Sequence, residues 1–323
     1  MPRVSHGAVV IMIKIAILLD ADAPDFYQQA AQINQFLQLS ELSSTPVALW
    51  LFSQTVPQSL PCLAREVTEV HWVTVPRQVE ARLMVLEQMQ QALAAQLLLF
   101  AGDEGEELAT RLAYRTTGTA CCNVEQAQIT DTECRVMKAV YNNHLRAELV
   151  MMQQPWCLSV ARGANTRIGS VPGPILAEQF QPTATCNTPW LLAFSDSPVQ
   201  EASPLNQARY VLAIGEGVGN AQNVLHLQRL ATRLGAELAA SRPVVMNAWC
   251  EMDRLLGMSG AIIAPEVCIA AGVSGAPAFS IGIRHSKFIV AINQDPQAAI
   301  FAQADVGIVA EMNAVLEELA NQL

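Results

Sequence analysis

Short apolar runs alternate with longer amphipathic runs along most of this chain, and this alternation constrains the fold more than any other feature. Ile15–Asp20 (IAILLD) and Tyr210–Ile214 (YVLAI) are continuous apolar segments with the length of a strand that is buried on both faces. Val79–Leu93 instead repeats its apolar residues every three or four positions, as one face of a helix does. The pattern predicts an α/β protein with mostly parallel sheets flanked by helices.

The same pattern places individual elements. In the first half we expect strands at 15–20, 46–52 and 97–101, helices at 26–37, 77–95 and 104–114, and then an antiparallel hairpin of 134–141 and 147–152 with a further strand at 156–160. In the second half we expect strands at 210–214, 236–240, 288–293 and 307–310, and helices at 223–234, 265–271 and 312–323.

The length of 323 residues exceeds what one hydrophobic core usually serves, so two domains are expected. Residues 164–208 lose all periodicity and carry six of the seventeen prolines, which is typical of a linker. We therefore predict a first α/β domain at 1–200, with this proline-rich linker beginning at about 164, and a second domain at 201–323.

Charge and hydropathy exclude several classes of protein. There are 29 acidic and 19 basic residues, and a net charge of -10 disfavours binding to nucleic acid. The longest apolar stretch, 8–19, contains Lys14 and is too short for a membrane-spanning helix. A secretory signal is the weaker interpretation of this stretch. A first buried strand is the stronger one, and Met12 could then be the true start, with 1–11 outside the native chain.

Eight cysteines raise the questions of disulfides and metal binding. No C-x-x-C spacing occurs, and no histidine stands at a ligand-like interval from a cysteine. We interpret the cysteines as small buried apolar residues of a cytoplasmic protein, and we expect no metal site.

Six loops of the second half follow predicted elements and are rich in small or polar residues, which suits ligand binding at the carboxyl ends of parallel strands. They lie at 215–220, 241–242, 257–260, 272–275, 291–295 and 304–311. The first nearly matches a dinucleotide fingerprint, but its third glycine comes one residue early, so a plain tight turn is an equal alternative. Arg242 could face a phosphate or an aromatic ring, or form a salt bridge to Glu251 or Asp253. Together the loops favour an extended ligand such as a dinucleotide.

Read in order, these segments resemble the carboxyl-terminal domain of the electron-transfer flavoprotein alpha subunit. The resemblance is carried by SRPVV (241–245), LLGMSGAIIAPEVCIAAGVSG (255–275), SKFIVAINQDPQAAIF (286–301) and ADVGIVAEM (304–312). It implies a Rossmann-like FAD-binding domain, a heterodimer with a beta-type subunit, and electron transfer from a dehydrogenase donor to a quinone-linked or other acceptor.

The resemblance also implies roles for single residues. Arg242 would lie against the flavin ring and Ser259 near one of its polar edges, while Ser241, Ser274 and the amides around Gly275 would hold the pyrophosphate and ribityl region. Asn293 and Glu311 would serve the adenosine end. The resulting predicted cofactor-binding residues are Gly217, Ser241, Arg242, Met258, Ser259, Gly272, Ser274, Gly275, Phe279, Asn293, Asp295 and Glu311.

Some positions depart from the family pattern. The family has Gln-His where this chain has Ala278-Phe279, Gly-Arg-Gly where it has 215–217 (Gly-Glu-Gly), and Gln where it has Met258. These differences keep two functions open. The first is a redox carrier that shuttles electrons without converting a substrate. The alternative is a degenerate FAD- or adenine-nucleotide-binding module without efficient redox function. A nicotinamide or FAD enzyme of related fold is a third, weaker possibility.

Overall fold

The computed structural model describes residues 14–42, 45–102, 104–130, 132–141, 145–162, 168–172, 176–183, 189–191, 193, 205 and 208–322. The described residues form two compact units, the first made of those before residue 199 and the second of those after it. Residues 1–11, the turn at 142–144 and much of the predicted linker lie outside the described residues.

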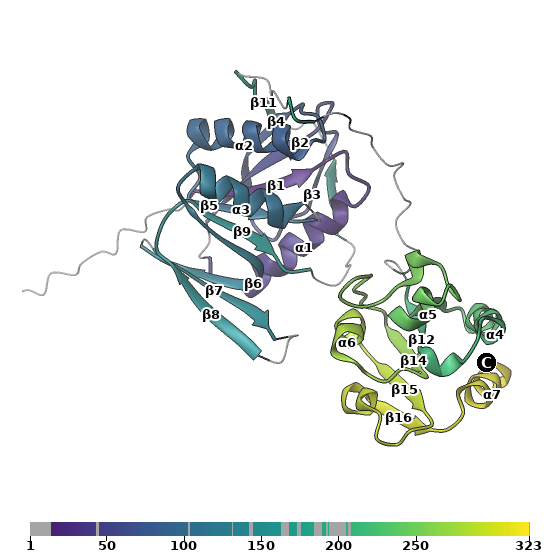
Figure 1. The fold of residues 1–323 in the computed structure, drawn as a ribbon. Coiled ribbons are helices and arrows are strands. Elements are labelled where there is room, and N and C mark those ends of the chain that lie inside the picture. Colours follow the sequence, from purple (N-terminus) through teal and green to yellow (C-terminus); the bar gives the residue numbers. More distant parts are fainter. Residues whose placement is uncertain are drawn as a thin grey trace, which may run out of the picture. The chain divides into compact units, whose positions relative to one another are not determined.

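The first unit is built on a nine-stranded sheet (Figure 1). Its order across the sheet is β11 (Glu178–Gln179), β4 (Val67–Val73), β2 (Val47–Phe52), β1 (Ile15–Asp20), β5 (Leu97–Phe100), β9 (Trp156–Val160), β6 (Thr119–Ile129), β7 (Cys134–Val140) and β8 (Leu145–Met151). All neighbours run parallel except β6 with β7 and β7 with β8. The antiparallel hairpin predicted at the edge of this sheet is therefore present.

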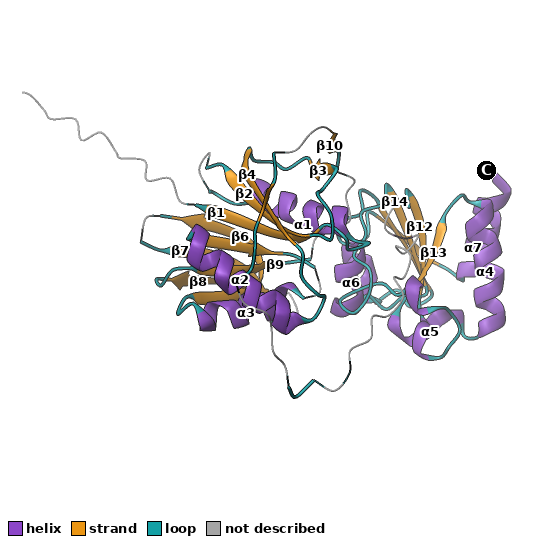
Figure 2. Cartoon of the chain, turned by 90° about the horizontal axis from the view of Figure 1, so that it is seen from above, coloured by secondary structure: helices purple, strands orange, loops and turns teal. Residues whose placement is uncertain are grey.

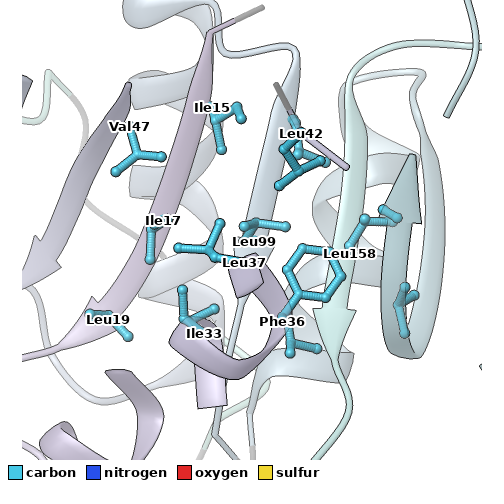
Figure 3. Packing of buried hydrophobic residues seen from close by; sticks show 14 of the residues in the cluster. Ile15, Ile17, Leu19, Ile33, Phe36, Leu37, Leu42, Val47, Leu99 and Leu158 are labelled. Atoms are coloured by element: carbon cyan, nitrogen blue, oxygen red, sulfur yellow. The ribbon is translucent and has the colours of Figure 1, made fainter. Parts of the chain in front are cut away.

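Alternate side chains along the central strands point into two separate hydrophobic cores, one on each face of the sheet. Ile15, Ile17 and Leu19 of β1 face α1 (Phe26–Leu39), whose Ile33 and Leu37 pack among them (Figure 3). The intervening residues of β1 face the opposite way, toward α2 (Val79–Leu93) and α3 (Gly105–Arg115). Because both faces are covered, the strands read as continuous apolar runs rather than as alternating ones.

Part of the predicted linker has regular structure. Ser170–Pro172 (β10) pairs antiparallel with Ser59–Pro61 (β3), and β11 adds to the outer edge of β4. The amide of Phe180 donates to the carbonyl of Trp72 at 2.8 Å. The described residues 168–172 and 176–183 thus belong to the first unit, although their sequence has no strand periodicity.

The second unit contains a five-stranded parallel sheet with the order β13 (Glu237–Ala240), β12 (Tyr210–Ile214), β14 (Val267–Ala271), β15 (Ile289–Asn293) and β16 (Val306–Val309). Figure 2 shows α4 (Ala221–Arg233) and α7 (Met312–Gln322) on one side of this sheet and α6 (Pro277–Ile283) on the other. The short helix α5 (Arg242–Met246) follows β13 directly.

One predicted element is wrong: 265–271 is not a helix, because Val267–Ala271 forms the central strand β14. A five-residue apolar run does not distinguish a buried strand from a helical segment by periodicity. Cys268 and Ala270 face one core and Ala271 the other, so small side chains suit a strand that is covered on both faces.

The described cysteines are mostly buried, and this predicts their reactivity. Burial raises the pKa of Cys157 and of Cys268 to about 12, so at pH 8 only about one thiol in ten thousand is ionised at either site. Cys62 is exposed. We expect iodoacetamide to modify Cys62 in the folded protein and to leave Cys157 and Cys268 intact until denaturant is added, as peptide mass spectrometry would show. Rapid labelling of Cys268 without denaturant would contradict this packing.

Candidate functional site

The order of the second sheet determines where a ligand can enter. Numbered along the chain, its strands stand in the order 2-1-3-4-5, so the connections leave β12 in opposite directions. Ligands of such open sheets bind beyond the carboxyl ends of the strands, where the winding changes direction. A cavity of about 820 Å³ lies at this place, lined by residues that follow β12, β13, β14 and β15.

The cavity brings together eleven of the twelve predicted cofactor-binding residues. Those that line it are Gly217, Ser241, Arg242, Met258, Ser259, Gly272, Ser274, Gly275, Phe279, Asn293 and Asp295. Glu311 is not among the lining residues. Its two carboxylate oxygens accept from the amides of Asn313 and Ala314 at 3.0 and 2.8 Å, so it caps the start of α7.

The glycines after β12 serve close packing. A Cβ on Gly215 would stand 2.1 Å from the carbonyl oxygen of Gly272, and the amide of Gly217 donates to that same oxygen at 3.1 Å. Glu216–Val218 then forms a single 3₁₀ turn before α4. The glycine pattern at 215–219, which nearly matches a dinucleotide fingerprint, is therefore explained by the close contact between the loops after β12 and β14. Gly217 nevertheless lines the cavity.

The loop after β14 presents a run of backbone donors. The amides of Val273, Ser274, Gly275 and Ala276 donate to no acceptor among the described residues, and all four residues line the cavity. Gly272 and Gly275 have φ of +63° and +85°, a conformation that turns successive N–H groups toward one side. Consecutive unpaired amides of this kind form a concave site for an anion.

Arg242 provides the positive charge of the cavity. Its side chain is exposed, and its guanidinium forms no hydrogen bond or ion pair with any described residue. The salt bridge considered from sequence does not form, and Asp253 contacts Arg254 at 3.8 Å. Ser241 beside it is buried, with its amide donating to the carbonyl of Ile214 at 2.9 Å.

Asn293 and Asp295 organise the loop after β15. The Asn293 side chain donates through Nδ2 to the carbonyl of Val273 at 2.8 Å and accepts from the amide of Asp295 at 3.0 Å. Asp295 in turn accepts from the amide of Gln297 at 2.9 Å. These bonds hold the ends of β14 and β15 together, so part of the polar capacity of Asn293 is already used.

One wall of the cavity is apolar. Leu255, Leu256 and Phe279 are buried and line it, while Met258 is 48% exposed and donates its amide to the carbonyl of Ala278 at 2.8 Å. Phe279 belongs to the core between the sheet and α6. The cavity thus has a polar end at 272–276 and 293–297 and an apolar end at 255–258 and 278–279.

Sequence reasoning missed several lining residues. Pro243, Leu255, Leu256, Val273, Ala276, Gln297, Ala298 and Ala299 complete the wall together with Glu216 and Ala278. Most are apolar or lack a functional group, so nothing in their chemistry distinguishes them from core residues. Their proximity to recognisable loop residues is the only signal that could have found them.

Comparisons with known proteins agree with this geometry. Residues 204–284 match the family model described as the electron transfer flavoprotein FAD-binding domain. The chain is 39% identical over 260 residues to YgcQ of Escherichia coli, which is named as an electron transfer flavoprotein subunit; the match covers 79% of this chain and 89% of that protein. It is 30% identical over 224 residues to protein FixB of Salmonella typhimurium, covering 68% and 70%. Among the described residues, no helix is long and apolar enough to cross a membrane.

Proposed function

Because the chain belongs to the electron-transfer flavoprotein alpha-subunit family, we propose that its second unit holds FAD in the 820 Å³ cavity and that, paired with a beta-type subunit, it carries electrons from a dehydrogenase to a quinone-linked or other acceptor. The observation that carries this proposal is the run of four unpaired amides at 273–276, located where the winding of the parallel sheet reverses.

The residues present fit such a cofactor. The unpaired amides suit a pyrophosphate, since they supply a run of backbone donors at the polar end, and Arg242 supplies one positive charge for the flavin ring. The apolar wall of Leu255, Leu256 and Phe279 suits a flat aromatic ring system. The volume lies in the upper part of the range of about 300–1,000 Å³ found for ligand sites. Glu216 and Asp295 add negative charge, so backbone donors must provide most of the attraction for phosphate.

FAD supplies the one- and two-electron chemistry, and the protein contributes binding and electrostatics. Arg242 would stabilise negative charge that develops on the ring, because its guanidinium is free of any competing carboxylate among the described residues. Leu255, Leu256 and Phe279 keep water from one side of the cavity.

The lining residues favour a carrier over an enzyme that converts a substrate. None of them, all within the described part of the chain, is a histidine, cysteine, lysine or tyrosine. Glu216 and Asp295 are the titratable acids, and both are exposed. A general base positioned by a second group, which substrate chemistry usually requires, is therefore not evident among these residues.

A second chain is part of the proposal. Subunits of this family generally pair with a beta subunit, and three methionine side chains of the second unit, one of them lining the cavity, are open to solvent. Met246, Met252 and Met258 are 54, 61 and 48% exposed. Flexible, polarisable methionines are common at protein-binding surfaces. The reducing cytoplasm is the compartment we propose, in keeping with the free thiols of the described cysteines.

Co-expression with the beta-type partner tests the proposal. We expect a one-to-one complex by light scattering, with the visible absorption of oxidised flavin, and a chain that is largely insoluble or free of flavin when made alone. Arg242→Ala should weaken FAD binding about ten- to hundredfold through loss of a charged donor. Arg229→Ala, on the exposed face of α4, is the matched control and should bind normally.

Each part of the proposal can fail separately. A well-folded but colourless complex would contradict FAD binding and favour the degenerate module. A stable monomer that holds stoichiometric FAD by itself would contradict the need for a partner. Equal FAD affinity in Arg242→Ala and Arg229→Ala would remove Arg242 from the site.

A further inference from the structure

The first unit has a cavity of its own, of about 250 Å³, that the proposed function does not use. It lies at the carboxyl ends of β1, β2 and β4, three adjacent parallel strands, and one wall comes from α2. We call it the small cavity. Its lining residues are Asp20, Asp22, Phe52, Ser53, Gln54, Thr55, Val75, Arg77 and Arg82.

Arg82 is a buried charged residue that lines the small cavity. It is 6% exposed, its Nη2 pairs with Oδ2 of Asp20, and its Nη1 pairs with Oε2 of Glu104 at 2.8 Å. Its guanidinium carbon lies 4.8 Å from the centre of the Phe52 ring. The Nε of Arg82 is nevertheless buried without a hydrogen-bond partner, and a buried donor left unpaired is uncommon enough to need an explanation.

The acidic groups of the small cavity are already satisfied. Asp20 accepts from the amide of Asp22 at 3.0 Å in addition to pairing with Arg82. Asp22 accepts from the Ser53 hydroxyl at 3.2 Å and from the Gln54 amide at 2.6 Å, so each of its oxygens has a donor. These carboxylates therefore offer little to a ligand.

The polar side-chain groups of the small cavity that lack hydrogen-bond partners among the described residues are mainly donors. Arg77 is half-buried and forms one hydrogen bond, from Nη2 to the carbonyl of Asp22 at 3.2 Å, and it pairs with no carboxylate of the described residues. The Thr55 hydroxyl has no partner among those residues either. Arg77 and Thr55 thus present unused N–H and O–H groups to the small cavity, while the unpaired Nε of Arg82 is buried and not open to it.

We propose that the small cavity binds a small oxyanion, a phosphate or a carboxylate group, with Arg77 as the forked donor at its mouth. Guanidinium groups match the planar pairs of oxygens of both anions. The small cavity has room for one phosphate or carboxylate group and a small part of the molecule that carries it. It is too small for a dinucleotide, which the larger cavity of the second unit could hold. The site is independent of the proposed FAD site, because its residues all belong to the first unit.

Calorimetric titration of the purified complex, saturated with FAD, tests this proposal. Inorganic phosphate, AMP and succinate serve as probes at constant ionic strength set with chloride. We expect saturable binding of at least one probe, weakened about tenfold or more in Arg77→Gln and less in Arg77→Lys, which keeps the charge without the fork. Arg115→Gln is the matched control, since that arginine also has one polar contact, to Glu87 at 3.3 Å, outside the small cavity.

The three probes distinguish the sources of the oxyanion. Binding of AMP and phosphate with the same dependence on Arg77 indicates a phosphate group, and binding of succinate alone indicates a carboxylate. If the protein contains no FAD, phosphate could also occupy the amides at 273–276; Arg77→Gln then removes one of two sites. No saturable binding to wild type, or equal binding by Arg77→Gln and Arg115→Gln, would overturn the proposal.

Discussion

Gly275→Ala is expected to destabilise the second unit by about 2–5 kcal/mol. A Cβ at this position would stand 2.2 Å from the backbone nitrogen of Ile300, and the residue has a φ of +85°. The left-handed conformation costs a side-chain-bearing residue roughly 1–2 kcal/mol, and overpacking typically adds about 1–3 kcal/mol. Urea denaturation followed by far-ultraviolet circular dichroism measures the loss. From the resemblance alone, loss of FAD would be expected before loss of folding; the contact with Ile300 changes that order.

Gly219→Ala separates the conformational cost of a positive φ from the cost of a steric clash. Gly219 has a nearly equal φ of +79°, but a Cβ there meets nothing within 4 Å. We expect this variant to lose only the conformational part, about 1–2 kcal/mol. Equal destabilisation of the two variants would mean that the approach of Ile300 to Gly275 is not a structural constraint.

Phe279→His is expected to raise the flavin midpoint potential by about 60–130 mV, provided that FAD binds as proposed. The electron-transfer flavoproteins that this chain resembles have histidine here, and phenylalanine cannot donate a hydrogen bond to the ring. A hydrogen bond to a charged group contributes about 1.5–3 kcal/mol, and about 1.4 kcal/mol corresponds to roughly 59 mV for one electron. Spectroelectrochemical titration of the complex measures the shift.

Phe279→Leu controls for altered packing in this prediction. Phe279 is only 7% exposed and packs with Leu256 and Ile283, so either substitution disturbs the core beside α6. Leucine brings no donor and should leave the potential near that of wild type. The same potential in the histidine and leucine variants would show that residue 279 does not donate to the ring.

The sequence predicted most strands that are buried on both faces, because such burial leaves a continuous apolar run, but it mistook β14 for a helix. The bounds of Trp156–Val160 and Tyr210–Ile214 match the expected ones to the residue. Strand β6 was not predicted: TACCNVEQAQI carries polar residues on its outer side and has irregular pairing with β7 and β9. The short helix α6 was missed as well, since it contains a glycine and has only seven residues.

The sequence predicted which loops form the candidate site, but it predicted less well which contacts each residue makes there. Small and polar residues identified 241–242 at a predicted strand end and 272–275 after a segment predicted to be a helix. Whether Arg242 is paired depends on where Glu251 and Asp253 lie in space, which local sequence does not encode. Glu311 did carry a signal of its structural role, because an acidic residue just before a helix commonly caps it.

The loop after β14 is held at several points by contacts within the second unit. Gly217 donates to the carbonyl of Gly272, Asn293 to that of Val273, and the amide of Ile300 to that of Ser274 at 3.1 Å. The donors at 273–276 are therefore arranged before any ligand arrives, so little conformational entropy remains to be lost on binding. Exchange of a ligand there would then be limited by what covers the cavity and not by rearrangement of the loop itself.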